Sequence, residues 1–315
     1  YFSTDEIQFE IEKHTFLIGI IFVLYGIHLF LDAASGTSSA ESVLRVLAFP
    51  ILFFVNVFLV PRVISFREFL EILARFGATL TAIGILIIVF DPIDLNIFVL
   101  EPWKGSVVIP CFGKVPMMRS VLFNPNALGL VTAIGAAGAL NEAIREKAKY
   151  AVLLFCLNAG GLYFTTARAG MGVLVLIISI YSFYIVTENV LTIGLMSVAG
   201  VIFILIAFIL ATIGFATLPI NASGRLILWR GVIEAFQQCP LIGYGPGDTG
   251  EYIRPYISGK MAGTTAGSFF RMFLTTGLFG GIAYILFTVI TIKNQFWKAI
   301  QGQQYEVLLF ALLVA

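Results

Sequence analysis

The segment from Gly170 to Thr187 reads GMGVLVLIISIYSFYIVT and contains no charged residue. An apolar run of about 18 residues or more can cross the hydrocarbon core of a bilayer as a helix. Helices suit this environment because they satisfy their backbone hydrogen bonds internally. The segment therefore predicts a transmembrane helix, and similar runs recur along the chain.

Nine apolar segments in total predict an all-α, polytopic transmembrane bundle of about nine spans. The third segment is short and the ninth is incomplete. They cover residues 15–31, 43–60, 77–90, 126–143, 150–165, 170–187, 190–215, 269–292 and 306–315. The chain begins without Met and ends within an apolar run, so we expect one transmembrane domain over residues 1–315, cut at both ends.

The composition supports a membrane protein and argues against other classes. Hydrophobic residues make up 59% of the 315 residues and charged residues only 12%, whereas soluble chains carry about 25% charged residues. A net charge of +1 argues against nucleic-acid binding, which needs a concentrated basic surface. The three cysteines and two histidines show no metal-ligand spacing, so no cofactor is expected.

The positions of Lys and Arg orient the helices, because short cytoplasmic loops carry an excess of both. If residues 61–76 form a cytoplasmic loop, the basic residues of the short segments gather on that side, namely Arg62, Arg67, Arg75, Arg145, Lys147, Lys149, Lys293 and Lys298. The two longest loops, 91–124 and 217–268, then lie outside. We expect a protein of the cytoplasmic membrane whose site faces the periplasm or the cell exterior.

Six arginines collect at this outer surface, namely Arg119, Arg168, Arg225, Arg230, Arg254 and Arg271. Arg168 stands in the sequence TTARAG between two apolar spans. Ionisable residues at such positions are usually functional. The alternative is a structural role in which the side chain extends along the membrane interface, and both interpretations fit these residues.

The outer loop at 217–268 carries the most informative sequence, NASGRLILWRGVIEAFQQCPLIGYGPG at residues 221–247. Ser223 suits a helix N-cap and Pro240 ends the helix. Apolar residues follow between them at helical spacing, at Leu226, Trp229, Val232, Ile233 and Phe236. The pattern predicts a short amphipathic helix that lies on the membrane.

The next residues, GYGPG from Gly243 to Gly247, predict a tight turn because glycine and proline dominate turns. Glycine also lets a backbone approach a ligand closely, so the segment is either a plain turn or part of a binding site. A polar patch follows it at Asp248, Glu251, Tyr252, Arg254 and Tyr256.

Four segments in this order resemble the O-antigen ligase and O-antigen polymerase superfamily of membrane glycosyltransferases. They are RSVLFNPN at 119–126, TARAG at 166–170, the stretch from SGR at 223–225 to GYGPG at 243–247, and SFFR at 268–271 with GLFG at 277–280. The resemblance covers roughly residues 119–284.

The resemblance implies an inverting, metal-independent transferase that takes a glycan from a polyprenyl diphosphate lipid in the membrane. The glycan passes to a hydroxyl of a glycan, lipid or protein acceptor. Arg168 and Arg225 are expected to bind the donor diphosphate, since guanidinium groups bind phosphate oxygens through paired hydrogen bonds. Further substrate contacts are expected from Arg119, Asn126, Arg230, Tyr252, Arg254 and Arg271.

One position departs from the superfamily, which usually carries a His-Asn pair where this chain has Ala266 and Gly267. The histidines, His14 and His28, are distant in sequence, and the predicted topology places the first in the cytoplasm and the second within a span. Three explanations fit. Asp248 or Glu251 acts as the base, the arginines alone lower the barrier, or this member is inactive or altered.

Two other functions fit a polytopic chain. A transporter of polysaccharides or lipid-linked glycans typically shows broken helices and inverted repeats, and the sequence shows no internal repeat. A non-catalytic member of the same superfamily would explain the missing histidine.

Overall fold

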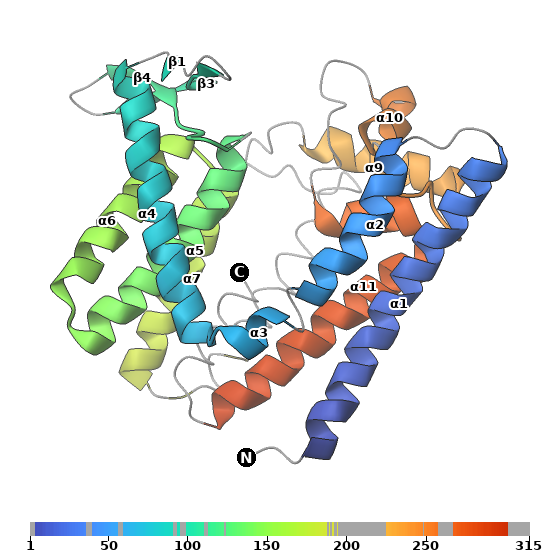
Figure 1. Cartoon of the computed structure of the whole chain (residues 1–315), viewed down its shortest axis with the longest axis horizontal. Coiled ribbons are helices and arrows are strands. Elements are labelled where there is room, and N and C mark those ends of the chain that lie inside the picture. The colour runs from blue at the N-terminus through green and yellow to red at the C-terminus, as the bar shows by residue number, and fades with distance from the viewer. Residues whose placement is uncertain are drawn as a thin grey trace, which may run out of the picture. The chain divides into compact units, whose positions relative to one another are not determined.

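The computed structural model describes residues 4–35, 40–55, 59–90, 93–94, 99–109, 113–122, 124–187, 225–247, 249–257 and 267–301, with positions 189, 191 and 194. This part of the chain is mostly helical (Figure 1). It divides into two compact units. The first unit consists of residues 1–60 and 198–294, and the second of residues 61–197 and 295–315.

In the part that the structure describes, the core of the second unit is a bundle of four helices. These are α4 (Phe66–Phe90), α5 (Pro125–Glu146), α6 (Lys149–Thr165) and α7 (Arg168–Thr187). Helix α5 contacts the other three (Figure 1). Two-residue connections join α5 to α6 and α6 to α7, so consecutive helices run antiparallel.

Small residues of α5 let these helices pack closely, as is common in membranes. A Cβ atom added to Gly135 would lie 2.9 Å from the carbonyl oxygen of Leu73 on α4, and one added to Gly138 would lie 2.9 Å from that of Leu70. Side chains larger than hydrogen do not fit at either position. The glycines of α5 therefore fix its distance from α4.

The polar side chain of Asn158 on α6 lies within this packing. It is fully buried, and its amide nitrogen donates to the carbonyl oxygens of Ala74 at 2.8 Å and Leu154 at 2.9 Å. Gly77 and Gly135 lie directly against its side-chain oxygen. The amide links α6 to α4, and such interhelical hydrogen bonds hold membrane helices together.

The loop predicted at 91–124 contains two antiparallel hairpins, so the all-α prediction needs correction. Strand β1 (Ile93–Asp94) pairs with β2 (Val99–Leu100), and β3 (Trp103–Ile109) pairs with β4 (Gly113–Met117). The chain after β4 returns to the bundle, where Met118 N–H donates to the carbonyl oxygen of Phe164 at 3.0 Å.

The first unit contains the remaining helices. They are α1 (Thr4–Ala34), α2 (Ala40–Phe54), α9 (Arg225–Gln238), α10 (Thr249–Ile253), the 3₁₀ turn η2 (Arg254–Tyr256) and α11 (Ser268–Ile300), with α3 (Val60–Val63) at the border of the units. Buried Ile21 and Tyr25 of α1 pack against Val46 of α2 and against Met272 and Tyr284 of α11.

Five of the described helices are long and apolar enough to cross a membrane, at Phe16–Ala34, Phe66–Phe90, Pro125–Ile144, Arg168–Thr187 and Ser268–Ile300. The second and fifth predicted spans are helical but shorter, since α2 has 15 residues and α6 has 17. The ninth predicted span and nearly all of the seventh lie outside the described residues.

The third predicted span was wrong at its start. Helix α4 begins at Phe66 instead of position 77, so most of the predicted loop at 61–76 is helix. The first turns of α4 carry charged residues, so the apolar run from which the span was predicted begins later. In the structure Glu71 pairs with Arg67 at 3.0 Å and with Arg75 at 3.5 Å. Such pairs four residues apart support helices.

Candidate functional site

Helix α11 is interrupted at Gly277, whose backbone angles are φ 65° and ψ −161°. This region of backbone space is accessible essentially only to glycine. An interruption frees amide and carbonyl groups that a continuous helix would pair. Within a membrane such groups need partners elsewhere, because an unpaired one costs several kcal/mol.

The segment at residues 240–247, here called the inserted loop, supplies these partners. Tyr244 N–H donates to the carbonyl oxygen of Leu274, and Gly245 N–H to that of Thr275, both at 2.9 Å. In the other direction, Leu278 N–H donates to the carbonyl oxygen of Pro240 at 2.8 Å. The backbone of the loop thus takes over hydrogen bonds that the helix has lost.

The glycines of the inserted loop are needed for this close approach. A Cβ atom on Gly243 would lie 2.5 Å from the backbone nitrogen of Gly277 and 2.6 Å from the carbonyl carbon of Thr275. Gly243 and Gly245 also have positive φ angles of 74° and 87°. The sequence predicted a turn or a ligand-contacting backbone here, and the structure shows a turn whose backbone contacts α11.

Helix α9 holds the inserted loop from the other side. Its buried residues Leu228, Val232 and Ala235 cluster with Leu274 of α11, and Trp229 stacks on Phe270 with ring centroids 5.5 Å apart. The predicted helix ends at Gln238, before Pro240 as expected. Of the predicted apolar residues, Val232 is buried, whereas Ile233 is 38% exposed. Ser223, the predicted cap, lies outside the described residues.

Tyr244 ties the inserted loop to α9. Its hydroxyl donates to the carbonyl oxygen of Ala235 at 2.9 Å, and its ring stacks on Tyr252 with centroids 4.8 Å apart. Burial, followed by the proximity of Tyr256, raises the pKa of Tyr244 to about 12. The phenol therefore stays protonated and remains a donor throughout the neutral range.

His28 also contacts the inserted loop, although it is more than 200 residues away in sequence. It is 6% exposed, and its Nε2 lies 2.8 Å from the carbonyl oxygen of Ile242. Because a carbonyl oxygen only accepts, Nε2 carries the proton. The ring lies against Gly245, where a Cβ atom would come within 2.9 Å of it. The predicted topology placed His28 within the first span, and nothing in the local sequence indicates its contact with the loop.

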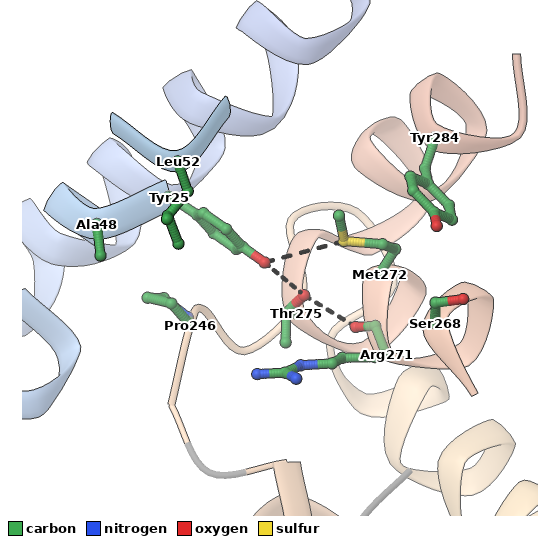
Figure 2. A pocket seen from close by; sticks show the side chains of 9 residues that line it. All are labelled: Tyr25, Ala48, Leu52, Pro246, Ser268, Arg271, Met272, Thr275 and Tyr284. Atoms are coloured by element: carbon green, nitrogen blue, oxygen red, sulfur yellow. Dashed lines mark hydrogen bonds between the residues drawn. The ribbon is translucent and has the colours of Figure 1, made fainter. Parts of the chain in front are cut away.

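A cavity of about 350 Å³ opens where the two arms of α11 meet (Figure 2). Arg271 comes from the first arm and Tyr284 from the second, and the interruption at Gly277 brings both to one space. The remaining wall consists of Tyr25, Ala48, Leu52, Pro246, Ser268, Met272 and Thr275. We call this space the elbow cavity.

Three predicted site residues lie at one end of the second unit. Arg119 is paired with Glu101 there. Its Nε donates to the carbonyl oxygen of Glu101 at 2.9 Å, and its guanidinium lies 3.6 Å from the Glu101 carboxylate. Asn126 is exposed near the start of α5. Arg168 begins α7 and is exposed, and Ala167 before it packs tightly on Gly129 of α5.

Residues 151–285 match the family model of O-antigen ligases. This part of the chain is therefore similar to O-antigen ligases. This family is a glycosyltransferase-like class of enzymes, and the spans identified above make the protein a multi-pass membrane protein. A search of curated proteins and a search of solved structures each found no match.

The region similar to O-antigen ligases extends from α6 into α11 and contains the inserted loop. Arg119 and Asn126 lie outside the matched region. Within it, the exposed members of the predicted site are Arg168, Arg230, Glu251, Arg254 and Arg271, and Tyr252 is half-buried. Arg225 is the first residue of α9, whereas its side chain and all of Asp248 lie outside the described part of the chain.

The matched region is divided between the two units, with Arg168 in the second and Arg225, Glu251 and Arg271 in the first. Arg271 lines the elbow cavity. Position 267, where the superfamily usually has the second residue of its His-Asn pair, is an exposed glycine directly before α11. Ala266 lies outside the described residues.

Proposed function

We propose that this protein transfers a glycan from a polyprenyl diphosphate lipid to an acceptor hydroxyl at the non-cytoplasmic face of the cytoplasmic membrane. The observation that carries the proposal is the O-antigen ligase match over residues 151–285. The arginines within that region support it, since a diphosphate donor needs cationic hydrogen-bond donors.

In the proposed reaction, the acceptor oxygen attacks the anomeric carbon as the bond from that carbon to the diphosphate oxygen breaks. The bonding electron pair leaves with the diphosphate, and the configuration at the anomeric carbon is inverted. Arg168 and Arg225 bind the diphosphate and stabilise its growing negative charge, which is the largest single contribution in many enzymes. No metal is needed for this step.

The proton of the acceptor hydroxyl goes to a carboxylate. Glu251 is one candidate, because it is exposed on α10 next to Tyr252 and the inserted loop. Asp248 is the other candidate. A positioned carboxylate contributes about 10² to 10⁴-fold to a rate as a general base. Arg230 of α9, Tyr252 of α10 and Arg254 of η2, elements that contact one another, would contact the acceptor or the donor glycan.

The test is glycan transfer by the purified full-length protein from a polyprenyl diphosphate-linked donor. Arg168→Ala and Arg225→Ala should each lower the rate by at least about 100-fold, because each removes a stabilising donor from the leaving group. Arg67→Ala is the matched control, since it removes a guanidinium that pairs with Glu71 near the start of α4. Undiminished transfer in both test variants would refute the proposed diphosphate role.

The interrupted helix α11 favours one other function, because transporters often build their sites from interrupted helices. A transporter moves its substrate between two compartments, whereas a transferase can act without separate compartments. Turnover of the donor by protein in detergent, where no compartments exist, therefore distinguishes the two. The same turnover would exclude a non-catalytic member of the family.

A further inference from the structure

The hairpin of β3 and β4 contacts the connection between α6 and α7, the segment that leads into Arg168. The Tyr163 hydroxyl near the end of α6 donates to the carbonyl oxygen of Val108 on β3 at 3.2 Å. Thr166 Oγ1 in the connection donates to the sulfur of Met117 on β4 at 3.6 Å. Both strands of the hairpin are therefore fixed next to Arg168, the residue for which a diphosphate contact is proposed.

Trp103 is an exposed aromatic residue of this hairpin. It is the cross-strand partner of Met117, and directly opposite residues of antiparallel strands have Cβ atoms about 4.5 to 5.5 Å apart. Because Met117 contacts Thr166, the indole lies one side chain away from the connection that leads into Arg168. Trp103 is 40% exposed, so part of its ring is accessible to a ligand.

Two charged side chains border this ring. The guanidinium carbon of Arg119 lies 6.0 Å from the ring centroid of Trp103, which is a cation–π distance. The same guanidinium holds Glu101 through its backbone carbonyl and its carboxylate, and the Glu101 side chain remains 54% exposed. The ring is thus held in place beside one acceptor group and one donor group, and the two opposite charges offset each other.

An aromatic ring with polar groups beside it suits a pyranose sugar. One face of a pyranose presents C–H bonds that carry partial positive charge, whereas the face of an indole is negative. The sugar hydroxyls both donate and accept, so they can bond to the Glu101 carboxylate and the Arg119 guanidinium. An anion gains less here, because the guanidinium is already paired and the carboxylate repels negative charge.

We propose that Trp103, bordered by Glu101 and Arg119, is a subsite for a neutral sugar ring of a glycan held at Arg168. The indole stacks on the C–H face of the pyranose, and the Glu101 carboxylate accepts a hydrogen bond from a sugar hydroxyl. The subsite lies outside the region similar to O-antigen ligases, so it adds a selective element to that region. Its link to Arg168 rests on the proposed function, whereas the sugar binding itself does not.

The fluorescence of Trp103 tests the subsite in the full-length protein in nanodiscs. Replacing every other tryptophan by phenylalanine, Trp229 and Trp297 among them, leaves Trp103 as the emitter, and phenylalanine can still stack on Phe270 at position 229. The probes are the methyl glycosides of glucose, galactose, mannose and N-acetylglucosamine. At least one of them should change the emission in a saturable way. Sorbitol, which has hydroxyls but no rigid C–H face, should not.

The other partner that an exposed tryptophan of a membrane protein can have is the lipid interface. Nanodiscs of brominated lipid distinguish it, because bromine quenches an indole that lies among lipid chains. Trp103 should be quenched much less than Trp297, which is 56% exposed on the spanning helix α11 and is measured as the emitter of a second variant. No saturable response to any of the four glycosides, with or without strong quenching of Trp103 by the lipid, would overturn the proposal.

Substitutions at Trp103 separate stacking from folding, with glycoside binding measured by saturation-transfer NMR. Trp103→Leu removes the aromatic face and should weaken binding of the responding glycoside about 3- to 10-fold, as expected for the loss of one ring contact. Trp103→Phe keeps a smaller ring and should retain part of the affinity. Trp297→Leu, the matched control in the last turn of α11, should bind like the unmodified protein. Equal binding by the Trp103→Leu variant would overturn the subsite.

Transfer kinetics then assign the sugar to the donor or to the acceptor. Trp103→Leu should raise the KM for the substrate whose sugar it binds and leave kcat nearly unchanged, because the subsite contacts that substrate away from the reacting carbon. Unchanged KM values for both substrates would remove the link to Arg168. Glycoside binding at Trp103 without any transfer by the unmodified protein would remove the proposed function and leave the sugar site. Transfer without glycoside binding would do the reverse.

Discussion

Glycine lets backbone segments approach closely in both units of this protein, but it serves opposite structural purposes in them. In the second unit, α4 to α7 are uninterrupted, and glycine allows close helix packing around the buried amide of Asn158. In the first unit, glycine allows a helix to be interrupted, and the inserted loop pairs its freed groups. The interruption lies within the region of the family match, and residues from both arms of α11 beside it line the elbow cavity.

The largest effect is expected from Gly277→Ala. Alanine at this φ and ψ is strained, and its Cβ would also overlap the backbone of Leu241 and Ile242. We expect a loss of more than about 3 kcal/mol, seen as a large fall in the apparent unfolding temperature of the purified protein or as failure to accumulate.

Gly26→Ala is the matched control for this change. Gly26 lies in α1 with no atom within 4 Å of an added Cβ, so alanine should be neutral or stabilise by about 0.5 to 1 kcal/mol. Equal stability of the two variants would show that the interruption in α11 is not a strict requirement of the first unit.

An intermediate effect is expected from Asn158→Ala in the second unit. The change removes the link to Ala74 on α4 and leaves a small void, at a cost of about 1 to 3 kcal/mol in the free energy of unfolding. Thermal unfolding measures it. Ser179→Ala on α7 is the control, because Ser179 makes its hydrogen bond within its own helix and is exposed. If the two changes cost the same, the amide does not hold the bundle together.

A smaller and local effect is expected from His28→Phe. The ring shape is retained but the hydrogen bond to Ile242 is lost, at a cost of about 0.5 to 1.5 kcal/mol. Hydrogen exchange of the Tyr244 and Gly245 amides, which pair with α11, should become faster. His28→Gln places an N–H donor at a similar distance and should restore slow exchange. Unchanged exchange in the phenylalanine variant would contradict the role of His28 in holding the loop.

The smallest effect is expected from Thr81→Val. The Thr81 hydroxyl is buried in the second unit and has no hydrogen-bond partner among the described residues. Valine has nearly the same shape, so the free energy of unfolding should stay the same or increase by up to about 1 kcal/mol. The unfolding temperature should therefore be unchanged or higher. A clear loss of stability would mean that the hydroxyl has a partner and that the second unit depends on a larger polar network.

The sequence predicted the helical character of this chain well, because long apolar runs leave few alternatives. It also placed α9 and its end before Pro240 correctly. It missed the first turns of α4, where ion pairs replace apolar residues. It also missed the hairpins before α5, because strands as short as β1 and β2 carry almost no periodic signal.

The site was harder to predict because its contacts are distant in sequence. Gly277 and GYGPG were visible as motifs, but nothing local indicates that one pairs with the other. His28 illustrates the same point, since its partner Ile242 lies in the inserted loop, 214 positions away in the sequence. The roles of Arg168 and Arg225 remain predictions from the family resemblance, and Arg119 proved to be paired with Glu101.

The interruption in α11 also has a consequence for how the chain is made. A ribosome synthesises the inserted loop before it synthesises the helix that the loop completes. When the two arms of α11 reach the membrane, the partners for Leu274, Thr275 and Leu278 have therefore already been made. A rearranged chain in which residues 240–247 followed α11 would have to insert a helix with unpaired backbone groups into lipid, which is strongly unfavourable. The order of these segments along the gene thus matches the order in which membrane insertion needs them.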